Sequence, residues 1–168
     1  MGAETKNADS TNEVHLFAKV LTASDGVIAG TREDLSSVAL VETLKLSGFE
    51  VTQQRVVSDG VESVASALRE MTENFAGLIV TTGGTGFTQR DLTPEGTRKV
   101  IEREAPGLAE AMRLVNPLGR LSRGVAGIKG NSIILNTPGS TKGCVECLNA
   151  VIDVVPHALR LLNGERLH

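Results

Sequence analysis

The sequence predicts an α/β fold, a three-layer α/β/α sandwich built around a largely parallel, Rossmann-like sheet in a single domain. Strand-like apolar segments alternate with helix-like segments along the chain, which is typical of consecutive β-α-β units. The 168 residues correspond to one domain of ordinary size, and no stretch rich in Pro, Gly or Ser divides them. Residues 1–13 are polar and have no periodicity, so they are predicted to form a flexible leader before a domain at 14–168.

The first half of the chain is predicted to contain two strands and two helices. The first strand is a continuous apolar run, and the second is rich in β-branched residues. The second helix is the clearer one, because Val61, Val64, Ala65 and Leu68 recur on one face. In chain order we expect a strand at 16–23, a polar loop at 24–34, a helix at 35–47 ended by Gly48, a strand at 50–58 and a helix from Val61.

The second half continues the alternation. The run at 77–82 is predicted to be a strand buried on both faces. A helix is expected to begin near Thr93, with Thr93 capping its free amides and Pro94 in its first turn. The charged segment 102–104 is interpreted as the solvent-facing side of a helix. The remaining expected elements are a helix at 107–115, a loop or hairpin at 116–130, a strand at 131–136 and helices to about residue 162.

Composition excludes several classes of function. The chain has four Phe and neither Trp nor Tyr, which argues against the aromatic platforms of single-strand nucleic-acid binders. Its net charge of −3 argues against a polyanion binder. No apolar run approaches the roughly 18 residues of a membrane span, and no signal peptide is evident. We therefore expect a cytoplasmic protein with no nucleic-acid or membrane partner.

The two cysteines, Cys144 and Cys147, are too few for a disulfide scaffold. They are interpreted as packing residues, and a redox dithiol near a helix start is the alternative.

The segment TTGGTGFTQRDLTPE, residues 81–95, carries the strongest chemical signal. Gly83, Gly84 and Gly86 would let backbone amides approach an anion, and the start of the following helix would add positive charge. Asp91 would repel a phosphate unless a divalent cation lay between them. The segment therefore predicts a phosphate and metal site, although a simple glycine turn with a polar neighbour remains the alternative.

Asp59 follows the second predicted strand and has two interpretations. It could cap the next helix, with Glu62 three residues later completing a capping box, and local spacing favours this. Alternatively, it is a second carboxylate at the same edge of the sheet and shares a metal with Asp91.

The charge distribution gives a separate indication of a phosphorylated ligand. Between residues 111 and 145 the chain has five basic residues and no acid, whereas the remainder is acidic. A solvated basic face is the simpler interpretation of any single one of these residues. Lys142 is the exception, because PGSTKG places it beside glycines at a strand-to-helix turn.

These segments resemble the signature of the molybdenum-cofactor biosynthesis family, whose members include MogA, MoaB and the G domain of gephyrin. The glycine-rich segment at 81–95 is the most similar part, and the likeness extends over about residues 14–164. The other matching segments, in the family's order, are SDG and AGTREDLS within 24–36, VVSDG at 56–60, EREAPGLAEAMR at 102–113, LSRGVAGIKG at 121–130 and NTPGSTKG at 136–143.

The resemblance implies a molybdopterin adenylyltransferase, which transfers AMP from Mg²⁺-ATP to the terminal phosphate of molybdopterin and releases pyrophosphate. Matched by motif, Asp91 and Asp59 would be the catalytic acids that hold Mg²⁺. The glycine loop, Gly83, Gly84, Thr85 and Gly86, would bind phosphate. The residues implied to line the nucleotide and pterin pocket are Ser24, Asp25, Pro138, Gly139, Ser140 and Lys142.

The resemblance also implies a homotrimer and a transient contact with the protein that inserts molybdate. Two departures from the common pattern support an alternative, a molybdopterin-binding carrier without catalysis. This chain has Ser24-Asp25-Gly26 where the family often has Ser-Asp-Arg, and its PGSTKG resembles that of MoaB-like members.

Overall fold

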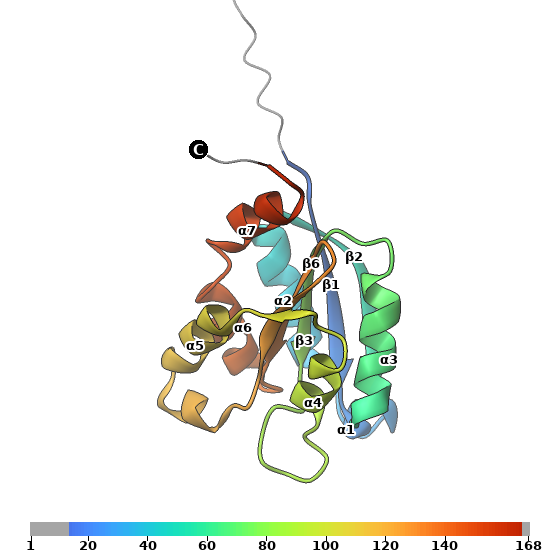
Figure 1. The fold of residues 1–168 in the computed structure, drawn as a ribbon. Helices are drawn as coiled ribbons and strands as arrows, with labels where there is room; N and C mark the ends of the chain where they lie inside the picture. The colour runs from blue at the N-terminus through green and yellow to red at the C-terminus, as the bar shows by residue number, and fades with distance from the viewer. Residues whose placement is uncertain (1–13, 166–168) are drawn as a thin grey trace, which may run out of the picture.

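A six-stranded sheet with the strand order β2-β1-β3-β6-β5-β4 forms the centre of the molecule (Figure 1). The computed structural model describes residues 14–165, so the predicted leader at 1–13 lies outside the described residues. β1, β2, β3 and β6 are parallel to their neighbours, whereas β5 pairs antiparallel with β6 and β4. The strands are β1 (Leu16–Ala23), β2 (Phe49–Val57), β3 (Gly77–Thr82), β4 (Arg103–Glu104), β5 (Ala126–Lys129) and β6 (Ser132–Thr137).

Helices cover both faces of the sheet, which confirms the predicted three-layer α/β/α fold with its largely parallel sheet. Every residue of β3 and β6 is buried as a result, whereas the edge strand β2 alternates between buried or half-buried and exposed residues. The helices are α1 (Asp25–Ile28), α2 (Leu35–Leu46), α3 (Val61–Thr72), α4 (Thr93–Arg98), α5 (Pro106–Leu114), the 3₁₀ helix η1 (Pro117–Leu121), α6 (Thr141–Asn149) and α7 (Val155–Leu162).

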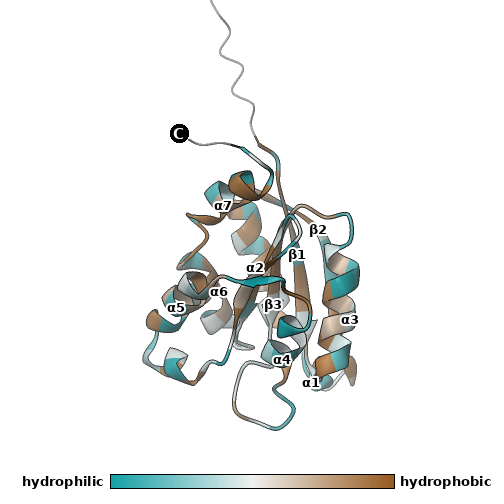
Figure 2. Ribbon diagram, in the orientation of Figure 1, coloured by the Kyte–Doolittle hydropathy of each residue, from teal (hydrophilic) through white to brown (hydrophobic). Residues whose placement is uncertain are grey.

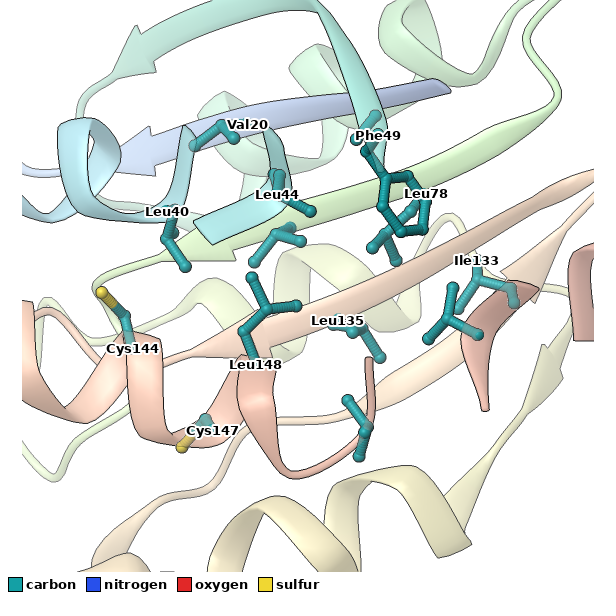
Figure 3. Close-up of a cluster of buried hydrophobic side chains, with 14 of the residues drawn as sticks. Val20, Leu40, Leu44, Phe49, Leu78, Ile133, Leu135, Cys144, Cys147 and Leu148 are labelled. Atoms are coloured by element: carbon teal, nitrogen blue, oxygen red, sulfur yellow. The ribbon is translucent and has the colours of Figure 1, made fainter. Parts of the chain in front are cut away.

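Two apolar clusters hold the layers together. The larger lies where α2, α5, α6 and α7 pack on one face of the sheet, and it includes Leu44, Leu78, Leu135 and Leu148 (Figure 3). The smaller lies under α3, where Leu68 packs toward the other face. Figure 2 shows hydrophobic residues along the central strands and alternating hydrophobic and hydrophilic bands on α3. Burial of these side chains is the main force that fixes the strand ends in place.

Most elements lie where the sequence predicts them, and three segments differ. The predicted loop at 24–34 contains the short helix α1, because the Ser24 hydroxyl accepts a hydrogen bond from the Val27 amide. The segment 102–104 is not a helix face, since Arg103 and Glu104 form β4 against β5. The loop or hairpin at 116–130 contains η1 and then β5, which forms an antiparallel hairpin with β6.

A further difference concerns Thr93, which does not cap α4. Leu92 occupies the cap position without a side-chain hydrogen bond, and Pro94 lies in the first turn as predicted. The Thr93 side chain is 1 % exposed and its amide donates to the Gly84 carbonyl. Thr93 is therefore a buried support beneath the glycine loop.

In the described part of the chain, no helix is long and apolar enough to cross a membrane.

Candidate functional site

A cavity of about 520 Å³ opens where the parallel strands end at their carboxyl edge. Figure 1 shows the loop between β3 and α4 at the same end of the molecule as α1, at the bottom of the view. Loops that follow β1, β2, β3 and β6 supply one side of the cavity, and the segment from α5 through η1 supplies the other. A cleft at this edge is the usual ligand site of a parallel α/β sheet.

All the predicted site residues except Asp25 line this cavity, although they come from four different loops. They are Ser24, Asp59, Gly83, Gly84, Thr85, Gly86, Asp91, Pro138, Gly139, Ser140 and Lys142.

The glycine loop requires glycine at Gly83 and Gly84, and at Gly86 a side chain would displace the Asp91 carboxylate. Gly83 has φ +94°, and a Cβ there would lie 2.3 Å from the Ala23 carbonyl oxygen. Gly84 has φ +68°, and a Cβ would meet the Thr93 hydroxyl at 2.2 Å. At Gly86 a Cβ would lie 2.8 Å from Oδ2 of Asp91. The loop can therefore fold closely over Ala23 and Thr93 only without side chains at positions 83 and 84.

Asp91 folds back against this loop. Its Oδ2 accepts a hydrogen bond from the Thr88 amide at 2.9 Å, and its backbone carbonyl accepts one from Arg123. The carboxylate lies in the cavity wall with Gly86. Asp91 is thus held by its own loop as well as by a residue 32 positions later.

Asp59 does not cap α3, contrary to the local spacing. The cap residue is Gly60, which makes no side-chain cap hydrogen bond. Instead, Oδ2 of Asp59 accepts from the Asp25 amide at 2.9 Å, and the Asp59 amide donates to Oδ1 of Asp25 at 3.1 Å. Burial raises the pKa of Asp59, and the nearby carboxylates of Asp25 and Asp91 raise it further. Three acids therefore lie near one another at this edge of the sheet.

Asp25 lies beside the cavity and is paired. Nε and Nη2 of Arg90 donate to its two carboxylate oxygens, and this guanidinium lowers the pKa of Asp25. Nη2 of Arg90 also donates to the Asp59 carbonyl at 2.7 Å. Arg90 therefore connects the loops that follow β1, β2 and β3.

The loop after β6 closes another part of the wall. The Ser140 hydroxyl caps α6 by accepting from the Gly143 amide at 3.1 Å. The Gly139 carbonyl accepts from the Ser36 hydroxyl at 2.8 Å, which ties this loop to the start of α2. Lys142 lines the cavity with its side chain 84 % exposed, and its Nζ lies 3.6 Å from Glu146.

The basic stretch has several roles in the structure. Arg113 and Lys142 line the cavity, as a phosphorylated ligand would require. Arg123 and Lys129 instead form ion pairs with Glu95 and Glu102.

Sequence reasoning missed two parts of the cavity wall. One is the loop before α2, where Asp34 accepts from the Thr22 hydroxyl and also caps α2. The other is the mostly apolar wall from α5 to Gly124, which the basic stretch and two family-like segments overlap but in which no site residue was predicted. Its lining residues are Ala109, Met112, Arg113, Val115, Asn116, Leu118, Gly119, Leu121, Ser122 and Gly124.

Cys144 and Cys147 are packing residues, as predicted. Both are buried in the larger apolar cluster (Figure 3), and burial raises the pKa of each thiol to about 11. Neither thiol has the lowered pKa of a redox dithiol.

Among residues 14–165, no three His, Cys, Asp or Glu side chains are arranged to hold a metal by themselves. The two acids Asp59 and Asp91 nevertheless line one cavity. Mg²⁺ often binds through one or two carboxylates together with substrate phosphates. A divalent cation bound with a phosphorylated substrate would therefore fit this donor set.

Comparison with known proteins shows the family of the chain. Residues 19–157 match the family described as "Probable molybdopterin binding domain". The chain belongs to the molybdenum-cofactor biosynthesis family. It is 40 % identical over 153 residues to a molybdopterin adenylyltransferase of Helicobacter pylori strain J99, with 86 % of each chain covered. The Escherichia coli K12 protein of the same name is 33 % identical, with 86 % of this chain and 84 % of that one covered.

Solved structures of family members have the same fold. The MoaB protein of Thermus thermophilus, described as a molybdopterin biosynthesis enzyme, superposes with a TM-score of 0.84 and 45 % identity. That comparison covers 91 % of this chain and 99 % of the other. The Mog protein of Mycobacterium ulcerans gives a TM-score of 0.81 at 36 % identity, with 90 % and 99 % covered.

Proposed function

We propose that the protein is a molybdopterin adenylyltransferase that uses ATP and Mg²⁺. The observation that carries this proposal is the common cavity that Asp59, Asp91 and the glycine loop line. The names of the curated relatives support the same activity.

In the proposed reaction, a terminal phosphate oxygen of molybdopterin attacks the α-phosphorus of ATP. The bond from that phosphorus to the bridging oxygen breaks, and pyrophosphate leaves with the electron pair. Such transfers depend mainly on positioning and charge stabilisation, since no covalent protein nucleophile is needed. The proposed reaction uses no protein nucleophile, and the glycines, hydroxyls and acids of the wall serve positioning and charge stabilisation.

Each part of the wall has a role in this proposal. The amides of Gly84, Thr85 and Gly86 bind phosphate oxygens, whereas the Gly83 amide donates to the Thr137 carbonyl. Lys142 and Arg113 supply positive charge at the rim. Asp59 and Asp91 would hold the Mg²⁺, which offsets phosphate charge when bound. The more apolar wall from α5 to η1 gives a surface for a flat ring.

The experiment is to incubate the full chain with ATP, Mg²⁺ and molybdopterin and to measure pyrophosphate. We expect release that requires all three components. Molybdopterin binding without any pyrophosphate release would contradict the proposal. Light scattering tests the homotrimer that the family resemblance implies, and a monomer mass would contradict it.

A molybdopterin-binding carrier is the second candidate. The observation that favours it is that Asp25 is paired with Arg90 and does not line the cavity. Calorimetry separates the two candidates, because a carrier would bind molybdopterin with the same affinity whether or not ATP was present.

A further inference from the structure

Arg123 binds the glycine loop at several points. Its backbone amide donates to the Thr85 carbonyl at 2.9 Å. Its side-chain Nε donates to the Gly86 carbonyl at 2.9 Å, and Nη2 donates to the Asp91 carbonyl. Arg123 thus contacts this segment at both of its ends, Gly86 and Asp91.

A second contact fixes the guanidinium itself. Nη1 of Arg123 forms an ion pair with Glu95 in the first turn of α4, and Nη2 lies 3.4 Å from the other carboxylate oxygen. Both side chains are about two-thirds buried, and the pair lowers the pKa of Glu95. Every nitrogen of the guanidinium therefore has a partner within the protein.

This arrangement argues against Arg123 as a phosphate ligand. Ser122 and Gly124 line the cavity, whereas Arg123 between them does not. Its donors are directed to backbone carbonyls and to Glu95 instead.

The position of the Asp91 carboxylate depends on the segment that Arg123 holds. Oδ2 of Asp91 accepts from the Thr88 amide and lies 2.8 Å from the position that a Cβ of residue 86 would take. If the chain from Gly86 to Asp91 shifted, both relationships would change together. Fixing the two ends of this segment therefore fixes the carboxylate.

We propose that Arg123 is a positioning residue that holds the segment from Gly86 to Asp91, and with it the Asp91 carboxylate, in place before substrate binds. The proposal rests on the proposed function for its effect on turnover. A lysine cannot replace this arginine, because one ammonium cannot reach two separated carbonyls and a carboxylate in a planar fork.

The first test measures the loop in the free protein by amide hydrogen exchange. Arg123→Lys is compared with the matched control Arg120→Lys, whose exposed parent side chain donates to the Pro117 carbonyl three residues away. In Arg123→Lys we expect amides from Gly86 to Asp91 to exchange at least about tenfold faster, with the strands unchanged. Unchanged exchange in that segment would overturn the proposal.

The second test is a double-mutant cycle on pyrophosphate release. We expect Arg123→Lys to lower kcat by roughly ten- to a hundredfold, as displaced catalytic groups do, and to leave the KM for ATP within about twofold. In an Asp91→Asn background the same change should cost much less, because its effect acts through Asp91. Independent, multiplicative losses would overturn the proposal.

Two further outcomes are distinguishable. If the wild type releases no pyrophosphate, the proposed function fails, and the exchange experiment still decides whether Arg123 holds the loop. If Arg123→Lys does not fold, Glu95→Gln replaces it, since it keeps the arginine and removes the charge that orients it. That variant should give a smaller exchange increase in the same segment, and no increase would overturn the proposal.

Discussion

Arg90 holds Asp25 with a two-pronged ion pair, in which Nε lies 2.9 Å from Oδ2 and Nη2 lies 3.0 Å from Oδ1. The two residues are 65 positions apart and belong to the loop after β3 and to α1. Because Nη2 also reaches the Asp59 carbonyl, this pair connects three of the loops around the cavity. It is solvent-accessible, so its effect should be seen in titration rather than in overall stability.

The first prediction therefore concerns the pKa of Asp25. Arg90→Gln should raise it toward the ordinary aspartate value, because the side-chain hydrogen bond from Arg90 is the largest cause of the lowering. A carboxyl whose pKa is lowered by folding stabilises the fold at pH values above its pKa in the unfolded chain. That contribution disappears as the pH falls through its pKa in the folded protein. Carboxyl carbon NMR during an acid titration measures the shift. Arg98→Gln, which removes an arginine paired with Glu104, is the control and should leave Asp25 unchanged.

A second prediction concerns the raised pKa of Asp59. Asp91→Asn should lower it, since the Asp91 charge is one of its causes, and burial should keep it above the ordinary value. The pKa of Asp59 is higher in the folded protein than in the unfolded chain. Its contribution to stability is therefore present below about pH 3.8, the ordinary pKa, and is lost as the pH rises through the pKa of the folded protein. The same NMR titration tests this. Glu110→Gln, an exposed change on α5, should not move the Asp59 pKa.

A third prediction separates catalysis by Asp91 from its part in the fold. Asp91→Asn should reduce pyrophosphate release by at least roughly a hundredfold, as the loss of an electrostatic group in a preorganised site does. Molybdopterin binding and the melting temperature should be retained, because an amide oxygen can still accept from the Thr88 amide. An unchanged rate would remove Asp91 from the reaction. Glu110→Gln again serves as the matched control.

A fourth prediction compares two glycines that have positive φ. Gly130 has φ +57° with open space around it, so Gly130→Ala should lower the free energy of unfolding by about 1–2 kcal/mol from backbone strain alone. Gly83→Ala adds a clash with the Ala23 carbonyl and should cost about 2–5 kcal/mol. Urea denaturation of both variants measures the difference. Equal losses would show that the close approach at Gly83 is not needed.

A fifth prediction concerns the buried thiols. Burial raises the pKa of Cys144 and of Cys147 to about 11, from an ordinary value of 9.0. Two pH units correspond to roughly a hundredfold less thiolate, the reactive form, in mildly alkaline buffer. Alkylation by iodoacetamide should therefore be slow in the folded protein and fast in urea. Rapid labelling of the folded protein would contradict the assignment of these cysteines to packing.

Strands that are buried on both faces were predictable, because each appears in the sequence as a continuous apolar run. β1 and β3 begin and end where their apolar runs do, because helices bury both faces of each. The glycines of the loop and Asp91 were also predictable as neighbours, since they lie within nine positions of one another.

The errors have a common physical cause, which is a partner far away in the sequence. Spacing suggested Asp59 as a helix cap, yet its carboxylate accepts from an amide 34 positions earlier. β4 exists because Arg103 pairs with Ile128, where the neighbouring Gly127 lets the strands approach closely. Arg123 belongs to the basic stretch, whose single residues apart from Lys142 were interpreted as a solvated face, but a glutamate 28 positions earlier and backbone carbonyls take its donors.

The hydrogen bond from the Ser36 hydroxyl to the Gly139 carbonyl joins residues 103 positions apart across the cavity. Because residues of the loop after β6 form part of its wall, the cavity is complete only when β6 has entered the sheet, although Asp59, Asp91 and the glycine loop are synthesised earlier. Folding of such non-local parallel topologies is intrinsically slow. Any ligand of this cavity recognises only the finished fold, so it should stabilise that fold by an amount that grows with the logarithm of the free ligand concentration once this exceeds the Kd. A fragment of the chain that ends before β6 would have Asp59, Asp91 and the glycine loop, but it would lack the wall that the loop after β6 supplies.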